Sequence, residues 1–241
     1  EAGHIPGARF FDIDEIADQR SDMAHMAPPP EKFMSRMRAM GVGDGHQVVV
    51  YDGHGMLSAP RVWWTFRLMG HRDVAELDGG FPKWPAEGLA IEDLPPEIKD
   101  RLLTARFQNH LVRDVTHVSR ASKRGSPQIV DARAAARFRG DAPEPREGLR
   151  AGHMPGAHNV PYDTLLNPDK TLKTPDQTRA VFEAAGIDLR QPIITSCGSG
   201  ITAAILALAL ERMGHDSWSL YDGSWAEWGM SPTVPVATGD A

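Results

Sequence analysis

Three blocks of sequence occur twice in the chain, in the same order and with nearly the same spacing. The paired blocks are GHIPGA (3–8) with GHMPGA (152–157), VVVYDGHG (48–55) with IITSCGSG (193–200), and LMGHRDVAELDGGFPKW (68–84) with ERMGHDSWSLYDGSWAEW (211–228). Self-similarity in a fixed order is the signature of a duplicated structural unit. We therefore predict two related domains, at 1–92 and 107–241, joined by a proline-containing, charged linker at 93–106.

Each copy alternates short β-branched runs with helical segments, which predicts an α/β fold with mainly parallel sheets flanked by helices. Val48–Val50 and Ile193–Ile194 are continuous apolar runs, as expected of strands that are covered on both faces. The segment ITAAILALALERM (201–213) is apolar nearly all round. It predicts a buried helix that ends at Gly214.

The two copies differ at their beginnings. In the second copy, PQIVDARAAARF (127–138) predicts a strand and a helix ahead of the GHMPGA block. Nothing equivalent precedes Gly3 in the first copy. We therefore expect the first domain to lack its N-terminal strand and helix and to leave a sheet edge open.

The composition excludes several classes of function. The net charge is −6 without a cluster of cations, which argues against a nucleic-acid surface. No apolar run approaches the roughly 18–20 residues that span a bilayer, so we expect no membrane segment. The chain has a single cysteine, and its ten histidines show no ligand-type spacing, so we expect no disulfide, metal or organic cofactor. A reducing compartment such as the cytoplasm is expected, although the chain begins at Glu1, so that a preceding targeting sequence would be invisible.

The single cysteine, Cys197, lies where a predicted strand meets a short glycine-bearing loop and a buried helix. Backbone N–H groups at such a point have no intrahelical partners, and the helix end is positive. A thiolate at Cys197 would be stabilised by both, and the neighbouring glycines let the backbone approach closely. The first copy has Asp52 at the aligned position. We therefore interpret Cys197 as a reactive group in one copy of the repeat, and not as an inert core residue.

Several cysteine chemistries share this arrangement. Cysteine-based phosphatases carry an arginine six positions after the cysteine, and here that position is Ala203. A phosphate-binding loop needs a Gly-Lys-Ser/Thr ending, which is absent. The glycine-rich GVGDG (41–45) precedes its strand, so a dinucleotide site is not indicated. A cysteine protease with a nearby histidine base remains open at this point.

The repeated Gly-His-x-Pro-Gly-Ala block, the cysteine in the second copy alone and the DGG/DGS pair resemble the tandem rhodanese-type sulfurtransferases. The loop CGSGIT (197–202) resembles that of the 3-mercaptopyruvate branch, whereas the thiosulfate branch tends to have Cys-Arg-Lys-Gly-Val-Thr. Cationic loop side chains suit a dianion such as thiosulfate, and a neutral loop suits a substrate with one carboxylate.

The resemblance also implies a set of site residues. Arg139 and Arg146 match the two arginines that hold the substrate's carboxylate and carbonyl. Ser199, His25 and Asp14 match a relay that handles the proton of the substrate thiol, with Cys197 as the nucleophile. The remaining substrate-binding residues are those of the loop: Gly198, Gly200, Ile201 and Thr202.

The expected reaction moves sulfur from 3-mercaptopyruvate through a persulfide on Cys197 to a thiol, a thioredoxin-like protein or cyanide, releasing pyruvate. One alternative is a thiosulfate:cyanide sulfurtransferase with the same nucleophile. Another is a non-catalytic carrier or sensor that relays sulfur for a partner protein.

Overall fold

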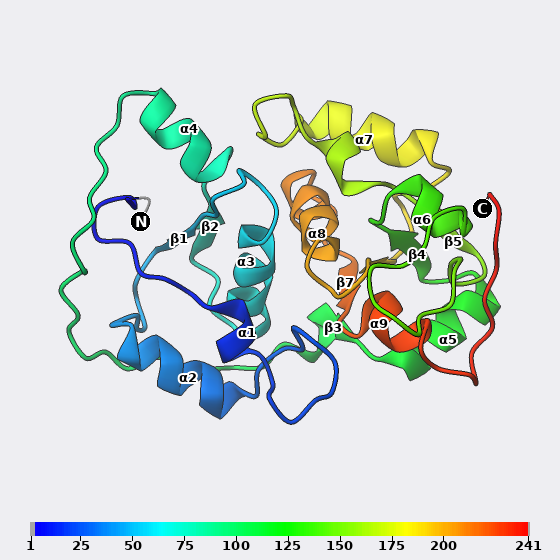
Figure 1. Ribbon diagram of the computed structural model, residues 1–241, viewed down its shortest axis with the longest axis horizontal. Helices are drawn as coiled ribbons and strands as arrows, with labels where there is room; N and C mark the ends of the chain where they lie inside the picture. Colours follow the sequence, from blue (N-terminus) through cyan, green and yellow to red (C-terminus); the bar gives the residue numbers. More distant parts are fainter. Residues whose placement is uncertain (1–2, 241) are drawn as a thin grey trace. The chain divides into compact units, whose positions relative to one another are not determined.

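The computed structural model describes residues 3–240, which divide into two compact units (Figure 1). The first unit runs up to Gln108 and includes Asn167–Leu172, and the second comprises Asn109–Leu166 and the chain from Lys173 onward. The predicted linker contains no helix, and its residues hydrogen-bond to the first unit. For example, the N–H of Arg106 donates to the carbonyl of Met69 at 2.7 Å.

The first unit is built around a parallel pair of strands. The elements of the unit are α1 (Ile13–Ile16), α2 (Pro30–Ala39), β1 (Val48–Val50), α3 (Ala59–Leu68), β2 (Val74–Glu76) and α4 (Gly80–Ala86). In the parallel register Val48 pairs with Val74 and Val50 with Glu76. Helix α3 packs against both strands and buries nearly all of its residues, including the two adjacent tryptophans Trp63 and Trp64.

The second unit has a parallel sheet in the order β3-β7-β6-β4-β5. Its strands are β3 (Val112–Arg113), β4 (Gln128–Asp131), β5 (Ala157–Asn159), β6 (Ile193–Ser196) and β7 (Trp218–Tyr221). Its helices are α5 (Val115–Arg124), α6 (Ala135–Arg139), α7 (Pro175–Ala184), α8 (Ala203–Arg212) and α9 (Ser224–Trp228), with 3₁₀ turns η1 (Asn109–Leu111) and η2 (Tyr162–Leu165). Helices α7 and α8 lie on one side of the sheet, and α5 and α9 on the other (Figure 1).

The predicted helix after Cys197 is confirmed, although it is shorter at its start. Helix α8 begins at Ala203, because Ile201 and Thr202 belong to the loop, and it ends just before Gly214, whose φ is +77°. Every residue from Ala203 to Leu210 is buried. An all-round apolar helix needs cover on both sides, and α8 contacts β6, β7 and α7.

The repeat is visible in the folded chain. The order strand–helix–strand–helix of β1, α3, β2 and α4 recurs as β6, α8, β7 and α9. The two GHxPGA blocks also make equivalent contacts, since His4 forms an isolated antiparallel bridge with Glu92, and His153 forms one with Ala237. Residues shared by both copies therefore hold the fold in each unit.

The expectation that Val48–Val50 is covered on both faces is wrong. Val49 is 54% exposed, whereas every residue of the equivalent strand β6 is buried. The reason is that β6 lies between β7 and β4, but β1 pairs with β2 alone among the described strands. A groove of about 1060 Å³ lies along the uncovered part of β1.

Candidate active site

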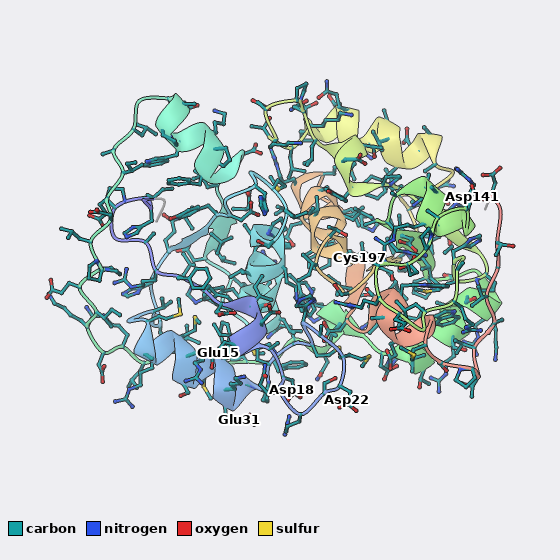
Figure 2. The ribbon with its side chains drawn as sticks, viewed as in Figure 1. Glu15, Asp18, Asp22, Glu31, Asp141 and Cys197 are labelled. Carbon is teal, nitrogen blue, oxygen red and sulfur yellow. The ribbon has the colours of Figure 1, made fainter. Side chains whose placement is uncertain are left out.

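Cys197 follows the last residue of β6, at the beginning of the loop that leads into α8 (Figure 2). Its side chain is buried, and its sulfur accepts a hydrogen bond from the N–H of Gly200 at 3.1 Å. Gly200 has a φ of +78°, a left-handed conformation that turns its N–H back toward the sulfur. The N–H groups of Ile201, Thr202 and Ala203 have no partner within residues 3–240. The loop therefore offers hydrogen-bond donors and a positive helix end to an anion at the sulfur.

The turn between β7 and α9 fixes the backbone of the cysteine loop. The N–H of Trp225 donates to the carbonyl of Cys197 at 2.9 Å, and the N–H of Ala226 donates to that of Gly198 at 2.8 Å. The hydroxyl of Ser224 accepts from the N–H of Cys197 at 3.1 Å and donates to the carbonyl of Tyr221 at 2.8 Å. Ser224 is fully buried, with a φ of +48°. These contacts with the cysteine loop were not predicted from the sequence, although the segment belongs to the repeated Asp-Gly-Gly/Ser block.

The equivalent loop of the first unit carries a carboxylate where the second carries sulfur. Asp52 follows β1, and its carbonyl accepts from the N–H of Phe81 at 3.0 Å, as the Cys197 carbonyl does from Trp225. Backbone N–H groups of Leu57, Ser58 and Ala59 donate to one carboxylate oxygen of Asp52, and the N–H of His54 donates to the other, all at 2.8–2.9 Å. Burial acts to raise the pKa of Asp52, but these four donors outweigh it and hold the pKa below its usual value. The repeated loop is thus a backbone cradle for negative charge.

We expect Asp52→Asn to lower the free energy of unfolding by roughly 1–3 kcal/mol at neutral pH, because buried N–H donors lose a charged acceptor. A carboxyl whose pKa is lowered on folding stabilises the fold above its unfolded pKa, and this stabilisation is lost as pH falls through the folded pKa. Urea unfolding at several pH values measures the difference in unfolding free energy between the wild type and Asp52→Asn. This difference should become smaller in acid. Asp22→Asn, at an exposed position, is the matched control. Equal unfolding free energies of the wild type and Asp52→Asn at neutral pH would contradict the claim that the backbone donors stabilise the charged carboxylate.

An arginine that was not among the predicted site residues lies against the cysteine loop. A methyl group built on Gly198 would come within 3.1 Å of Nη2 of Arg137. Arg137 lies on α6, and its guanidinium is held by the buried carboxylate of Glu144, with Nη2 2.6 Å from Oε2 and Nε 3.3 Å from Oε1. Nη1 of Arg137 has no hydrogen-bond partner in the described residues. A cation therefore lies beside the loop, with one nitrogen open to a ligand.

The two predicted arginines have different surroundings. Nε of Arg139 donates to Asp141 at 2.7 Å and lies 4.0 Å from a carboxylate oxygen of Asp240, and none of its hydrogen bonds reaches the loop. Arg146 is partly buried and makes no hydrogen bond or ion pair with any residue between 3 and 240. Residues two apart on a helix lie about 200° apart around its axis, so Arg137 and Arg139 project in nearly opposite directions from α6.

Behind Arg137 lies a buried ion network. Arg133 donates three side-chain hydrogen bonds of 2.7–3.1 Å to Asp131, one to Glu144 at 2.8 Å and one to the carbonyl of Gly152 at 2.8 Å. Its guanidinium carbon is 4.3 Å from the centre of the Trp225 ring. Asp131, Arg133 and Glu144 have almost no exposed side-chain surface. Arg133 and the partly exposed Arg137 together balance the charges of Asp131 and Glu144, which allows both carboxylates to be buried.

The structure brings together His25 and Asp14 in the first unit. Nε2 of His25 lies 3.0 Å from a carboxylate oxygen of Asp14, on α1. His25 has a φ of +66°, and its carbonyl accepts from the guanidinium of the buried Arg61 on α3. Ser199 belongs to the second unit, two residues after Cys197. The remaining predicted residues, Gly198, Gly200, Ile201 and Thr202, form the loop itself.

Within residues 3–240, no group of three or more His, Cys, Asp or Glu side chains could hold a metal ion. None of the helices described here is long and apolar enough to cross a membrane.

The comparisons with known proteins all point to one protein family. The sequence profile of the rhodanese-like domain matches residues 1–87 and 114–231. The 3-mercaptopyruvate sulfurtransferase of Escherichia coli K12 is 44% identical over 97% of this chain and 83% of its own length. An Arabidopsis thaliana protein, thiosulfate/3-mercaptopyruvate sulfurtransferase 1, mitochondrial, is 39% identical over 98% of this chain and 68% of its own.

The fold agrees with these sequence matches. A crystal structure of SseA from Escherichia coli superposes with a TM-score of 0.85 at 43% identity, covering 92% of this chain and 83% of that one. The matched segments contain the repeated strand–helix–strand cores of both units. This protein belongs to the rhodanese-like family of α/β proteins, with two rhodanese-like segments in tandem.

Proposed function

We propose that this protein is a 3-mercaptopyruvate sulfurtransferase with Cys197 as its nucleophile. The observation that carries the proposal is the Cys197 sulfur at the end of β6, hydrogen-bonded by a backbone N–H in a loop without cationic side chains. The Escherichia coli and Arabidopsis relatives, whose names include 3-mercaptopyruvate, support this substrate.

In the proposed reaction the Cys197 thiolate attacks the sulfur of 3-mercaptopyruvate. A new S–S bond forms as the carbon–sulfur bond breaks, and the electron pair of that bond leaves on the pyruvate fragment as an enolate. The proton from the substrate thiol ends on the methyl carbon of pyruvate, so the step needs no external oxidant or reductant. The resulting persulfide is an anion, which the N–H groups of the loop and the start of α8 stabilise.

The substrate carboxylate and ketone need donors beside the loop. We assign this role to Arg137 and Arg146, because Arg137 lies against Gly198 and both guanidinium groups have donors open to a ligand. A planar guanidinium can bind a carboxylate through two parallel hydrogen bonds. Arg139 is not assigned this role, because it projects from α6 away from Arg137 and none of its hydrogen bonds reaches the cysteine loop.

We further propose that Ser199, with the His25–Asp14 pair, moves the proton of the substrate thiol. The 3.0 Å contact between His25 and Asp14 supports this role, since the carboxylate orients the imidazole and stabilises its protonated form. Thiosulfate has no thiol proton, so the relay would act on 3-mercaptopyruvate and not on thiosulfate.

We expect Ser199→Ala to lower turnover of 3-mercaptopyruvate by about 100-fold, the lower range for loss of general acid–base catalysis. Sulfur transfer from thiosulfate to cyanide should change little. The measurement is pyruvate release with a thiol acceptor, run beside thiocyanate formation from thiosulfate. Equal losses with both substrates would contradict a proton-transfer role for Ser199.

The same pair of assays decides between the candidate functions. Faster turnover of thiosulfate than of 3-mercaptopyruvate would make the protein a thiosulfate:cyanide sulfurtransferase. A persulfide on Cys197 that forms without pyruvate release would indicate a sulfur carrier. As acceptors of the persulfide sulfur we propose small thiols or a thioredoxin-like protein. A reducing compartment such as the cytoplasm fits a chain whose single cysteine must stay a thiol.

A further inference from the structure

Glu144 lies at the junction of the buried ion network and the cysteine loop. One of its carboxylate oxygens, Oε1, accepts from Nη1 of Arg133 at 2.8 Å, and Oε2 accepts from Nη2 of Arg137 at 2.6 Å. Its side chain is 1% exposed, whereas that of Arg137 is 27% exposed. Glu144 therefore links a fully buried arginine to one that reaches the surface beside Gly198.

The backbone around Glu144 is stiff. The residue stands between Pro143 and Pro145, and a residue that precedes proline is restricted to extended conformations. Its carboxylate is further held by Arg133, which Asp131, the Gly152 carbonyl and the Trp225 ring fix in turn. An arginine side chain alone has several rotatable bonds, and ordering it on binding costs free energy. A carboxylate fixed in this way can remove that cost in advance.

We propose that Glu144 is a positioning residue that acts through Arg137. It grips the Nε–Nη2 edge of the guanidinium, so that Nη1 stays open toward a carboxylate-bearing substrate at the cysteine loop. This inference rests on the proposed function, in which Arg137 binds the substrate carboxylate. Glu144 itself touches no reacting atom in this account.

The test is a double-mutant cycle with Glu144→Gln and Arg137→Gln, read as kcat/KM for pyruvate formation from 3-mercaptopyruvate. We expect Arg137→Gln to lower kcat/KM by about 100-fold and Glu144→Gln by about tenfold, mainly through KM, as charge-assisted hydrogen bonds are lost. If Glu144 acts through Arg137, the double variant should lie within about twofold of Arg137→Gln. Glu147→Gln, at an exposed position in the same loop, is the matched control.

A second readout separates positioning from a general structural role. Enzyme preloaded as the persulfide and mixed with cyanide performs the second half of the reaction, in which no carboxylate is bound. Glu144→Gln should leave that rate unchanged, whereas a loosened loop would slow it. Should Glu144→Gln fold poorly, Glu144→Asp keeps the charge on a shorter side chain. We expect Glu144→Asp also to lower kcat/KM. When it is combined with Arg137→Gln, it should add no more than Glu144→Gln does.

The outcomes distinguish the two proposals. Additive losses in the cycle, or an equal slowing of both half-reactions, would overturn the role of Glu144 while leaving the sulfurtransferase assignment intact. If Arg137→Gln had no effect while pyruvate was still formed, both the role of Glu144 and the assignment of Arg137 would be wrong. If the wild type formed no pyruvate, the proposed function itself would fail, and with it the inference.

Discussion

Replacement of the nucleophile, Cys197→Ser, should reduce pyruvate formation from 3-mercaptopyruvate to background. The reaction requires an S–S bond, which a serine oxygen cannot form, and the chain has no other cysteine to take its place. The hydroxyl is smaller than the thiol and can still accept the Gly200 N–H, so we expect the fold to persist. Pyruvate is measured with excess acceptor, and intact mass shows whether the chain gains one sulfur atom.

Thermal unfolding of Cys197→Ser provides the control for folding. A variant with an unchanged midpoint, no pyruvate formation and no added sulfur supports the assignment of the nucleophile. Pyruvate formation at the wild-type rate by a folded Cys197→Ser would show that the chemistry does not use this cysteine.

The second large effect is expected on stability. Arg133→Gln leaves Asp131 and Glu144 buried with one cation fewer, and the loss of one partner from a buried ion network costs about 3–5 kcal/mol. The variant also loses the guanidinium over the ring of Trp225, the residue whose backbone N–H donates to the carbonyl of Cys197. We therefore expect a lower midpoint in urea unfolding and a lower rate of pyruvate formation together.

Arg190→Gln is the matched control for this prediction. Arg190 also pairs with an aspartate two residues before it, at 2.9 Å, but its side chain is 91% exposed. Exposed ion pairs contribute about 0–1 kcal/mol, so this variant should unfold close to the wild type. A similar small change for Arg133→Gln would mean that the buried network does not hold the second unit together.

The repeat was the most informative part of the sequence. It predicted two related units, and the alignment of Asp52 with Cys197 placed these two residues in equivalent loops, as the structure has them. Strand β1 and the end of α8 were predictable because continuous β-branched runs and a helix-ending glycine are local signals. The exposure of Val49 was not, because burial of a strand depends on its neighbours in the sheet.

The residues around the cysteine loop were harder to predict. Arg137 and Arg139 are two positions apart, and only the orientation of the short helix α6 decides which of them reaches Gly198. Glu144 and Arg133 meet through tertiary packing, and a glutamate between prolines gives no local sign of burial. The segment Asn167–Leu172 lies deep in the second half of the sequence, yet it belongs to the first unit, where the N–H of Leu172 donates to Asp78. No local pattern in the sequence indicates that this segment belongs to the first unit.

The most direct test of the central claim is a single turnover with 3-mercaptopyruvate in the absence of an acceptor. The proposed function predicts a burst of one pyruvate per chain, with an intact mass greater by one sulfur atom located at Cys197. Thiosulfate should load the same cysteine more slowly. A protein with a reactive Cys197 thiol that releases no pyruvate, or that takes sulfur from thiosulfate faster, would contradict the assignment.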